Sequence, residues 1–223
     1  MPEPTRQLLV LASNSPRRRE LLALTGLLFH VQSAPVDETP RAGERPRDFA
    51  IRMAREKATA VAAVQRSGLA VLAADTVVVD GDQILGKPAD LAEAERMLRR
   101  LRGREHTVIT AVAIQPRDAD EPTIEVCETN VPMRDYTDGE LAQYLATGDS
   151  LDKAGAYGIQ NRDFEPVAGL QGCFANVMGL PLCHVTRALR RQGVEPPEDV
   201  PEQCRGFTDY ECGVFPAILA GQL

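Results

Sequence analysis

The chain has 223 residues, of which 43% are hydrophobic and 26% charged, and its 32 acidic and 25 basic residues give a net charge of −7. This composition is that of one soluble globular domain, long enough to bury roughly 70% of its unfolded surface and to fold without a disulfide or metal staple. The acidic charge argues against broad nucleic-acid binding, but it allows a small polyanion in a local basic site.

No run of residues approaches the ~18 consecutive apolar positions of a membrane span, and the opening sequence MPEPTRQLLVLASNS lacks a signal-peptide pattern. We therefore expect a cytoplasmic protein with no membrane partner. The five cysteines are odd in number and lack CxxC spacing, so we interpret them as reduced thiols. Zinc binding by Cys204 and Cys212 is the less favoured interpretation.

Arginine dominates the basic residues: 22 of the 25 are Arg, and the three lysines are Lys57, Lys87 and Lys153. A compact ammonium with three movable donors is not replaced by a planar guanidinium. These three positions are therefore candidates for places where ammonium geometry matters, and chance is the alternative explanation.

Residues 8–12 (LLVLA) are typical of a strand and lead into a polar turn. Ser15 suits an N-cap and Pro16 the first position of a helix that ends near Gly26. Such a junction directs free backbone N–H groups and the positive end of the helix at one point. The arginines at positions 17–19 repel that end unless an anion binds there, so we favour a phosphate site over a solvated basic turn.

A helix is expected over residues 49–64, after a proline-containing loop that carries Asp37 and Glu38. Apolar side chains recur along it with the helical period. Lys57 falls in the middle of this buried stripe, so its ammonium either reaches solvent along its own stem or meets an anion.

Residues 69–79 form a nearly continuous apolar run, typical of a strand covered on both faces, and Asp75 interrupts it. The turn signal at residues 80–81 predicts a hairpin. In that hairpin we expect Asp75 to lie opposite Gly86 or Lys87. The buried carboxylate would then pair with a lysine, either as a structural ion pair or as part of a functional site.

Further elements are interpreted as scaffold: helices over residues 90–102 and 137–147 with capping-box patterns, strands over 105–115 and 122–133, and a last helix from Gly179. His30, His106 and His184 have no sequence partners that indicate a metal or a triad.

The C-terminal residues 194–223 contain four prolines and show no clear periodicity. We predict an irregular or partly ordered tail of unknown role, following a domain of residues 1–193.

Residues 149–160 (DSLDKAGAYGIQ) place Lys153 and Gln160 in a glycine-rich segment, where the backbone can approach a ligand closely. A mobile surface loop is the alternative.

Seven short motifs occur in order along the chain. They are Ser13-x-Ser15-Pro16-Arg17-Arg18-x-Glu20-Leu21-Leu22, Val36-Asp37-Glu38, Arg55-Glu56-Lys57-Ala58, Ala74-Asp75-Thr76, Gly86-Lys87-Pro88, the run LDKAGAYGIQ at residues 151–160, and Gly179-Leu180-Pro181-Leu182. Each alone is weak, but together they resemble the Maf family of nucleoside triphosphate pyrophosphatases.

The resemblance implies an α/β fold related to that of inosine triphosphatase, with a mixed, curved sheet, flanking helices and two lobes around a cleft. It implies hydrolysis of a nucleoside triphosphate to the monophosphate and pyrophosphate by a homodimer with a divalent metal, Mg²⁺ or Mn²⁺. Asp75 would activate the water and Glu38 would bind the metal. The residues that would bind the phosphates are Ser13, Arg17, Arg18, Lys57, Lys87 and Lys153.

Base specificity in this family varies at positions matching Arg17, Thr76 and Gln160. The residues here look like those of the dTTP/UTP branch, which implies a role in cleaning the nucleotide pool, whereas the 7-methyl-GTP branch tends to Trp, Gln and Glu. The segment at residues 161–166 (NRDFEP), beside the expected base pocket, departs from the family pattern.

Three alternatives stay open: a 7-methyl-GTP pyrophosphatase, a nucleotide-binding regulator of cell division without turnover, and a nucleotidyltransferase. The last is the least favoured, because SNSPRRR lacks the glycines of a phosphate loop.

Overall fold

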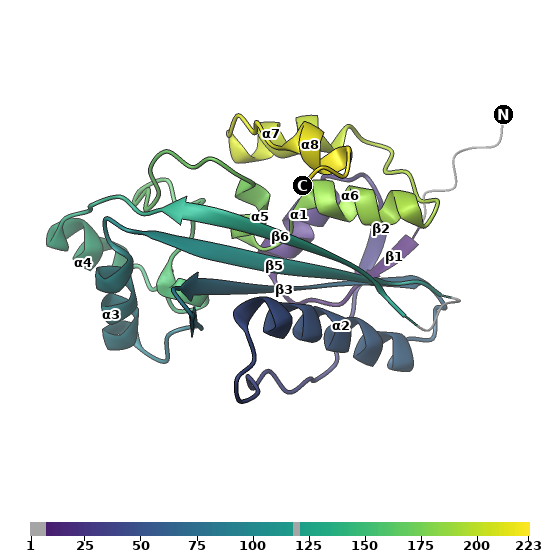
Figure 1. Cartoon of the computed structure of the whole chain (residues 1–223), viewed down its shortest axis with the longest axis horizontal. Helices are drawn as coiled ribbons and strands as arrows, with labels where there is room; N and C mark the ends of the chain where they lie inside the picture. The colour runs from purple at the N-terminus through teal and green to yellow at the C-terminus, as the bar shows by residue number, and fades with distance from the viewer. Residues whose placement is uncertain (1–7, 118–120) are drawn as a thin grey trace.

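The computed structural model describes residues 8–117 and 121–223, and its centre is a mixed six-stranded sheet (Figure 1). The strand order is β2-β1-β3-β5-β6, with the short β4 paired to β3. β1 runs parallel to β2 and β3, and the other pairs are antiparallel. The strands are β1 (Leu8–Leu11), β2 (Leu28–Val31), β3 (Ala70–Asp80), β4 (Gln83–Leu85), β5 (Glu105–Gln115) and β6 (Thr123–Pro132).

Helices flank both faces of the sheet: α2 lies on one face, and α1, α5 and α6 lie on the other, with α7 and α8 stacked over α6 (Figure 1). α3 and α4 lie at the far end of the long strands. The helices are α1 (Pro16–Ala23), α2 (Pro46–Val64), α3 (Leu91–Leu101), α4 (Asp138–Ala146), the 3₁₀ turn η1 (Ala154–Ala156), α5 (Phe174–Met178), α6 (Leu182–Arg191), α7 (Val200–Thr208) and α8 (Phe215–Leu219). The expected α/β class, with a mixed sheet and flanking helices, is confirmed.

β3 explains how one sheet carries two cores. Leu72 and Ala74 belong to the cluster under α1, α5 and α6, while Val71 and Ala73 belong to the cluster under α2. Because successive strand residues point to opposite faces, a strand covered on both sides must be apolar throughout. The prediction of a doubly covered strand is confirmed.

The helix caps follow the sequence signals. Ser15 caps α1, and Thr137 with Glu140 forms a reciprocal capping box at α4. At α3, Asp90 accepts from Glu93 N, but the Glu93 carboxylate accepts from Ala89 N, one residue before the cap.

The stretch between α1 and α2 differs from the proline-containing loop that the sequence indicates. Residues Leu28–Val31 form β2, which pairs with β1 at the edge of the sheet and shows no burial alternation. Pro46 occupies the first turn of α2, where its missing N–H is tolerated, so the helix begins before Phe49.

The expectation of an irregular or partly ordered C-terminal tail is corrected by the structure, because residues 194–223 contain α7 and α8. Pro201 and Pro216 stand in the first turns of these helices, positions that favour proline instead of excluding it. Asp199 caps α7 by accepting from Glu202 N, a start signal that the sequence contained. Val200 is buried in the core beside α6.

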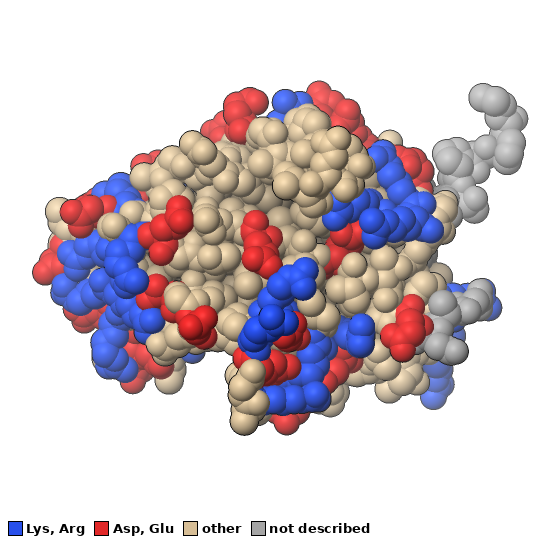
Figure 2. All heavy atoms as spheres, in the orientation of Figure 1, with Lys and Arg blue, Asp and Glu red and all other residues tan. Residues whose placement is uncertain are grey.

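Charged side chains of both signs are interspersed over the face shown in Figure 2. The arginines around α3 pair with carboxylates: Arg100 and Arg104 contact buried Asp80, and Arg99 and Arg102 contact Asp138. Each of the two carboxylates is thus shared by two arginines. In the described parts of the chain, none of the helices combines the length and hydropathy of a membrane span.

The fold predicts loss of stability in mild acid. His106 and His184 are buried, and burial lowers the pKa of each to about 4. In the unfolded chain the pKa is about 6.5, so protons bind the unfolded state preferentially between these values. We expect the free energy of unfolding to fall as the pH drops below about 6.5, by about 2 kcal/mol per histidine at pH 5.

Urea denaturation at pH 7.5 and pH 5.0 measures this loss. The variant His184→Gln should lose less stability than the wild type over the same interval. Equal losses in the two proteins would contradict the role of His184.

Candidate active site

The turn between β1 and α1 gathers hydroxyl and guanidinium groups at the start of a helix. The Ser15 hydroxyl accepts from Arg18 N at 3.4 Å, and the buried Ser13 hydroxyl accepts from Ser15 N at 3.2 Å. The Ser13 hydroxyl also accepts from Arg18 Nη1 at 3.4 Å. The predicted strand–turn–helix junction is therefore present, with Pro16 in the first turn.

Arg18 extends from α1 toward Thr76 of β3 and Gly179 after α5, and together with Ser13 these residues form a polar corner. Its Nε donates to the Gly179 carbonyl at 2.9 Å, and its Nη2 donates to the Thr76 hydroxyl at 3.1 Å. Burial lowers the pKa of Arg18, while the charges of Asp75 and Glu38 oppose that shift. A half-buried guanidinium held by neutral acceptors keeps net positive charge available at the site.

Two residues that the sequence did not single out continue this network. The Thr110 hydroxyl lies 2.9 Å from the Thr76 hydroxyl and donates to the Asn176 carbonyl at 3.1 Å. Asn176 is fully buried, and its Nδ2 donates to Val108 O and to the Thr129 hydroxyl. A threonine inside the apolar strand 105–115 was the available signal.

Asp75 and Glu38 converge on one ammonium group. Lys57 Nζ lies 2.6 Å from Asp75 Oδ1 and 2.7 Å from Glu38 Oε1. Lys57 comes from the middle of α2, Asp75 from β3 and Glu38 from the loop before α2. The inward-facing lysine therefore meets anions, as one of the two interpretations of its position predicted.

The expectation that the hairpin pairs Asp75 with Lys87 is wrong. β4 ends at Leu85, which pairs with Val78, and Lys87 lies beyond it with an exposed side chain. Asp75 instead lies opposite Ala111 of β5. The partner comes from a helix packed on the sheet, because a short hairpin does not extend its register as far as Asp75.

Burial and charge act in opposite directions on the two carboxyl groups. Burial raises the pKa of Asp75, against the charge and hydrogen bond of Lys57 and the charge of Arg18. The hydrogen bond from Lys57 lowers the pKa of the more exposed Glu38, and the charge of Lys87 acts in the same direction. The pKa values of the two carboxyl groups are therefore shifted in opposite directions.

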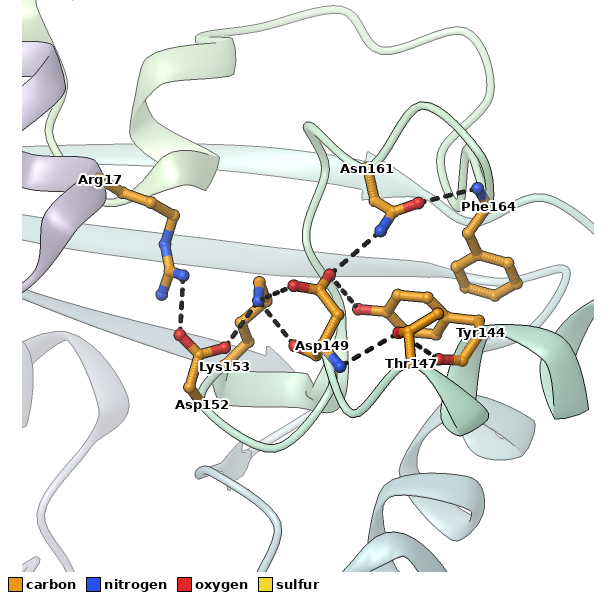
Figure 3. Close-up of polar contacts among 8 residues, drawn as sticks. All are labelled: Arg17, Tyr144, Thr147, Asp149, Asp152, Lys153, Asn161 and Phe164. Atoms are coloured by element: carbon orange, nitrogen blue, oxygen red, sulfur yellow. Dashed lines mark hydrogen bonds and ion pairs between the residues drawn. The ribbon is translucent and has the colours of Figure 1, made fainter.

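Lys153 organises the segment at residues 149–160, which lies next to Arg17 of α1 (Figure 3). Its Nζ donates to the Asp149 carbonyl and lies 2.6 Å from carboxylate oxygens of both Asp149 and Asp152. Asp152 also pairs with Arg17 Nη1 at 3.1 Å, which ties α1 to this segment. Burial disfavours ionisation of Asp152, but Lys153 and Arg17 outweigh it and lower the pKa of that carboxyl.

The glycines of this segment serve packing. Gly155 has φ +70°, and an added Cβ would lie 2.9 Å from Val78 Cγ1, so only glycine fits against β3. A Cβ on Gly158 would meet Lys153 Cε at 2.8 Å and Gln160 Nε2 at 3.2 Å. Gln160 therefore lies beside Lys153, with its own side chain exposed.

Residues 161–166 are held in place despite departing from the expected pattern. Asn161 Nδ2 donates to Asp149 Oδ2 at 3.1 Å, and its Oδ1 accepts from Phe164 N at 2.9 Å (Figure 3). The Phe164 ring stacks on Tyr144 of α4 at 4.3 Å. Arg134 donates to the Phe164 carbonyl at 2.8 Å.

The donor set fits a divalent cation that arrives with a phosphorylated ligand. Among the residues that the structure describes, there is no group of three or more His, Cys, Asp or Glu side chains able to hold a metal alone. Oxygens of Glu38 and Asp75 nevertheless lie within 2.7 Å of a single point, occupied by Lys57 Nζ. Mg²⁺ is commonly bound through one or two carboxylates, with water and phosphate oxygens completing its shell.

Comparison with known proteins shows a family match over most of the chain. The family described as Maf-like protein matches residues 8–192. The dTTP/UTP pyrophosphatase of Myxococcus xanthus is 50% identical over 190 residues, covering 85% of this chain and 95% of that protein. The dTTP/UTP pyrophosphatase of Geobacter sulfurreducens is 47% identical over 185 residues, covering 83% and 96%.

Among solved structures, a nucleoside-triphosphatase / dITP/XTP pyrophosphatase from Mycobacterium abscessus covers 83% of this chain and 94% of that chain, at 17% identity and a TM-score of 0.39.

The geometry predicts that Lys57 controls the ionisation of Asp75. In Lys57→Met we expect the pKa of Asp75 to rise further, because the closest opposing charge and hydrogen bond are removed while burial remains. Carboxyl ¹³C NMR titration measures this pKa. In the control Lys87→Met the pKa of Asp75 should stay at the wild-type value, and equal shifts in both variants would contradict the assignment.

Proposed function

The chain belongs to the Maf family, and from this membership we propose that it hydrolyses dTTP and UTP to the nucleoside monophosphate and pyrophosphate. One observation carries the proposal: charged and polar residues from separate motifs form three neighbouring clusters. Lys57 contacts Asp75 and Glu38, and Arg18 contacts Thr76, the residue after Asp75. Arg17, next to Arg18, pairs with Asp152, which also contacts Lys153. Their chemistry suits a polyphosphate and a water molecule.

Phosphate binding is assigned to the cationic groups and to the start of α1. Arg18 would contact the phosphate chain from its fixed place against Gly179, and Ser13 would add a hydroxyl. Arg17, Lys87 and Lys153 would neutralise further charge, for which Arg17 and Lys153 must exchange carboxylate partners for phosphate. Cleavage of a triphosphate needs such neutralisation because negative charge accumulates on the leaving pyrophosphate.

Asp75 is the proposed general base. It would take a proton from the attacking water while the water oxygen bonds to phosphorus, the α–β anhydride bond breaks and pyrophosphate leaves with the electron pair. Burial raises the pKa of this carboxyl, which makes it a better proton acceptor than an exposed aspartate. Lys57 would hold Asp75 in position until substrate arrives.

A divalent cation, Mg²⁺ or Mn²⁺, is assigned to Glu38, with Asp75 as a second oxygen donor. When bound, it would neutralise phosphate charge and polarise the scissile bond. Lys57 would have to leave the space between the two carboxylates for a cation to be held there, since both groups are positive.

Base selection is assigned to Arg17, Thr76 and Gln160. An exposed amide at position 160 can donate to and accept from the edge of a pyrimidine, whereas a carboxylate suits the donor edge of guanine. The segment 161–166, ordered by Asn161 and Phe164, would form the rim of the base pocket.

We also propose that the enzyme acts in the cytoplasm, as a homodimer, to remove unwanted nucleotides from the pool.

For Asp75→Asn we expect dTTP binding near the wild-type level and loss of turnover by ~10²–10⁴-fold, since the amide keeps the shape but removes the base. Calorimetric titration measures binding, and pyrophosphate release measures turnover. Turnover at the wild-type rate would refute the role of Asp75.

A pyrophosphate-release panel with Mg²⁺ or Mn²⁺ tests the substrate. We expect kcat/KM for dTTP and UTP to exceed that for ATP and 7-methyl-GTP by at least ~10²-fold, because a buried polar edge left unpaired disfavours the wrong base. If 7-methyl-GTP ranked first, the pyrimidine assignment would fail and the pyrophosphatase assignment would stand. Binding without release of pyrophosphate from any nucleotide would instead indicate a regulator.

A further inference from the structure

The C-terminal segment of residues 194–223 lies outside the part of the chain that matches the family, which ends at residue 192. The two relatives compared above are covered to 95% and 96% of their length by only 85% and 83% of this chain. The segment is therefore additional to what those relatives share with the chain. Yet α7 contacts both α5 and α6, and Gly179, whose carbonyl accepts from Arg18, lies between these two helices.

Tyr210, directly after the cap of α7, makes polar contacts with the residues that precede α5. Its hydroxyl donates to the Leu170 carbonyl at 3.0 Å and accepts from Gly172 N at 3.3 Å. Its ring lies 5.6 Å from the ring of Phe174, the first residue of α5. One side chain therefore fixes three successive points of the approach to α5.

Packing contacts and hydrogen bonds connect these residues to the polar corner around Arg18. Gly172 is pressed against β6, since a Cβ there would lie 2.7 Å from Thr129 Cγ2. Asn176 of α5 is bound to Thr129 on one side and, through its carbonyl, to Thr110 on the other. Gly179, the C-cap of α5, offers its carbonyl to Arg18 at 2.9 Å.

We propose that Tyr210 is a positioning residue for Arg18: its hydroxyl fixes residues 170–172, these fix α5, and α5 sets the Gly179 carbonyl that orients the guanidinium. The inference rests on the proposed function for the statement that Arg18 binds phosphate. Its structural half, that Tyr210 holds α5, is independent of any activity.

Tyr210→Phe is the test variant, because it removes the hydroxyl and keeps the ring on Phe174. Arg18 would contact the phosphate chain already in the enzyme–substrate complex, so its displacement should raise KM for dTTP about fivefold. A variant that only unfolds more readily would lose active enzyme, which lowers the apparent kcat and leaves KM unchanged.

Thr208→Val is the matched control. It also removes one hydroxyl hydrogen bond in the same segment, from Thr208 to the Cys204 carbonyl at 2.8 Å, but that bond stays within α7. We expect wild-type KM in the control. In an Arg18→Lys background, Tyr210→Phe should raise KM by less than twofold, because the lysine cannot use the Gly179 geometry.

Amide hydrogen exchange of the unliganded protein separates the inference from the proposed function. Residues 173–180 should exchange faster in Tyr210→Phe than in Thr208→Val. Exchange at the wild-type rate, or a KM effect of equal size in the Arg18→Lys background, overturns the proposal. A wild-type protein that hydrolyses no nucleotide refutes the proposed function, and the exchange result still decides whether Tyr210 holds α5.

Discussion

A carboxylate inside a doubly covered strand is the constraint on which the arrangement of the site depends. Asp75 is buried in β3, where an unpaired charge destabilises the fold by several kcal/mol. α2 therefore has to pack at the position that brings Lys57 within 2.6 Å of it. The same ammonium also pairs with Glu38 in the loop before α2. The negative charges of Asp75 and Glu38 both act on Arg18. The burial of Asp75 thus accounts both for the position of α2 on the sheet and for the charges that surround the site.

The scarcity of lysine has a geometric counterpart. Lys57 and Lys153 each place one nitrogen within 2.7 Å of two carboxylates, an arrangement suited to a compact ammonium. Arg18, in contrast, uses its planar guanidinium to donate to three separate acceptors, on Ser13, Thr76 and Gly179. Lys87 is the exposed member of the three lysines, and its charge acts on Glu38 at a distance. The structure thus provides a geometric reason for lysine at two of the three positions.

Local rules predicted much of the fold, and long-range packing decided what they missed. The Ser15 cap, the 80–81 turn and the continuous apolar run of β3 are properties of a few neighbouring residues, and each is present. The partner of Asp75 was predicted as Lys87 because a hairpin is local, whereas Lys57 reaches it through helix–sheet packing. Thr110 and Asn176 escaped notice because their role exists only once β5 and α5 are in contact. α7 and α8 are short and show no clear periodicity in the sequence, although a proline stands in the first turn of each.

The strand order has a consequence for how the protein acquires its site. β1 lies between β2 and β3 in the sheet. Arg18 of α1 donates to the carbonyl of Gly179, which is 161 positions later in the chain. Contacts of such sequence separation carry the largest loop-closure entropy and are expected to form late in folding. Helices and the β5–β6 hairpin can assemble earlier from local contacts, without creating the corner between Ser13, Thr76 and Gly179. Recovery of ligand binding during refolding would therefore report completion of the native topology, after helical signals have already reached their final values.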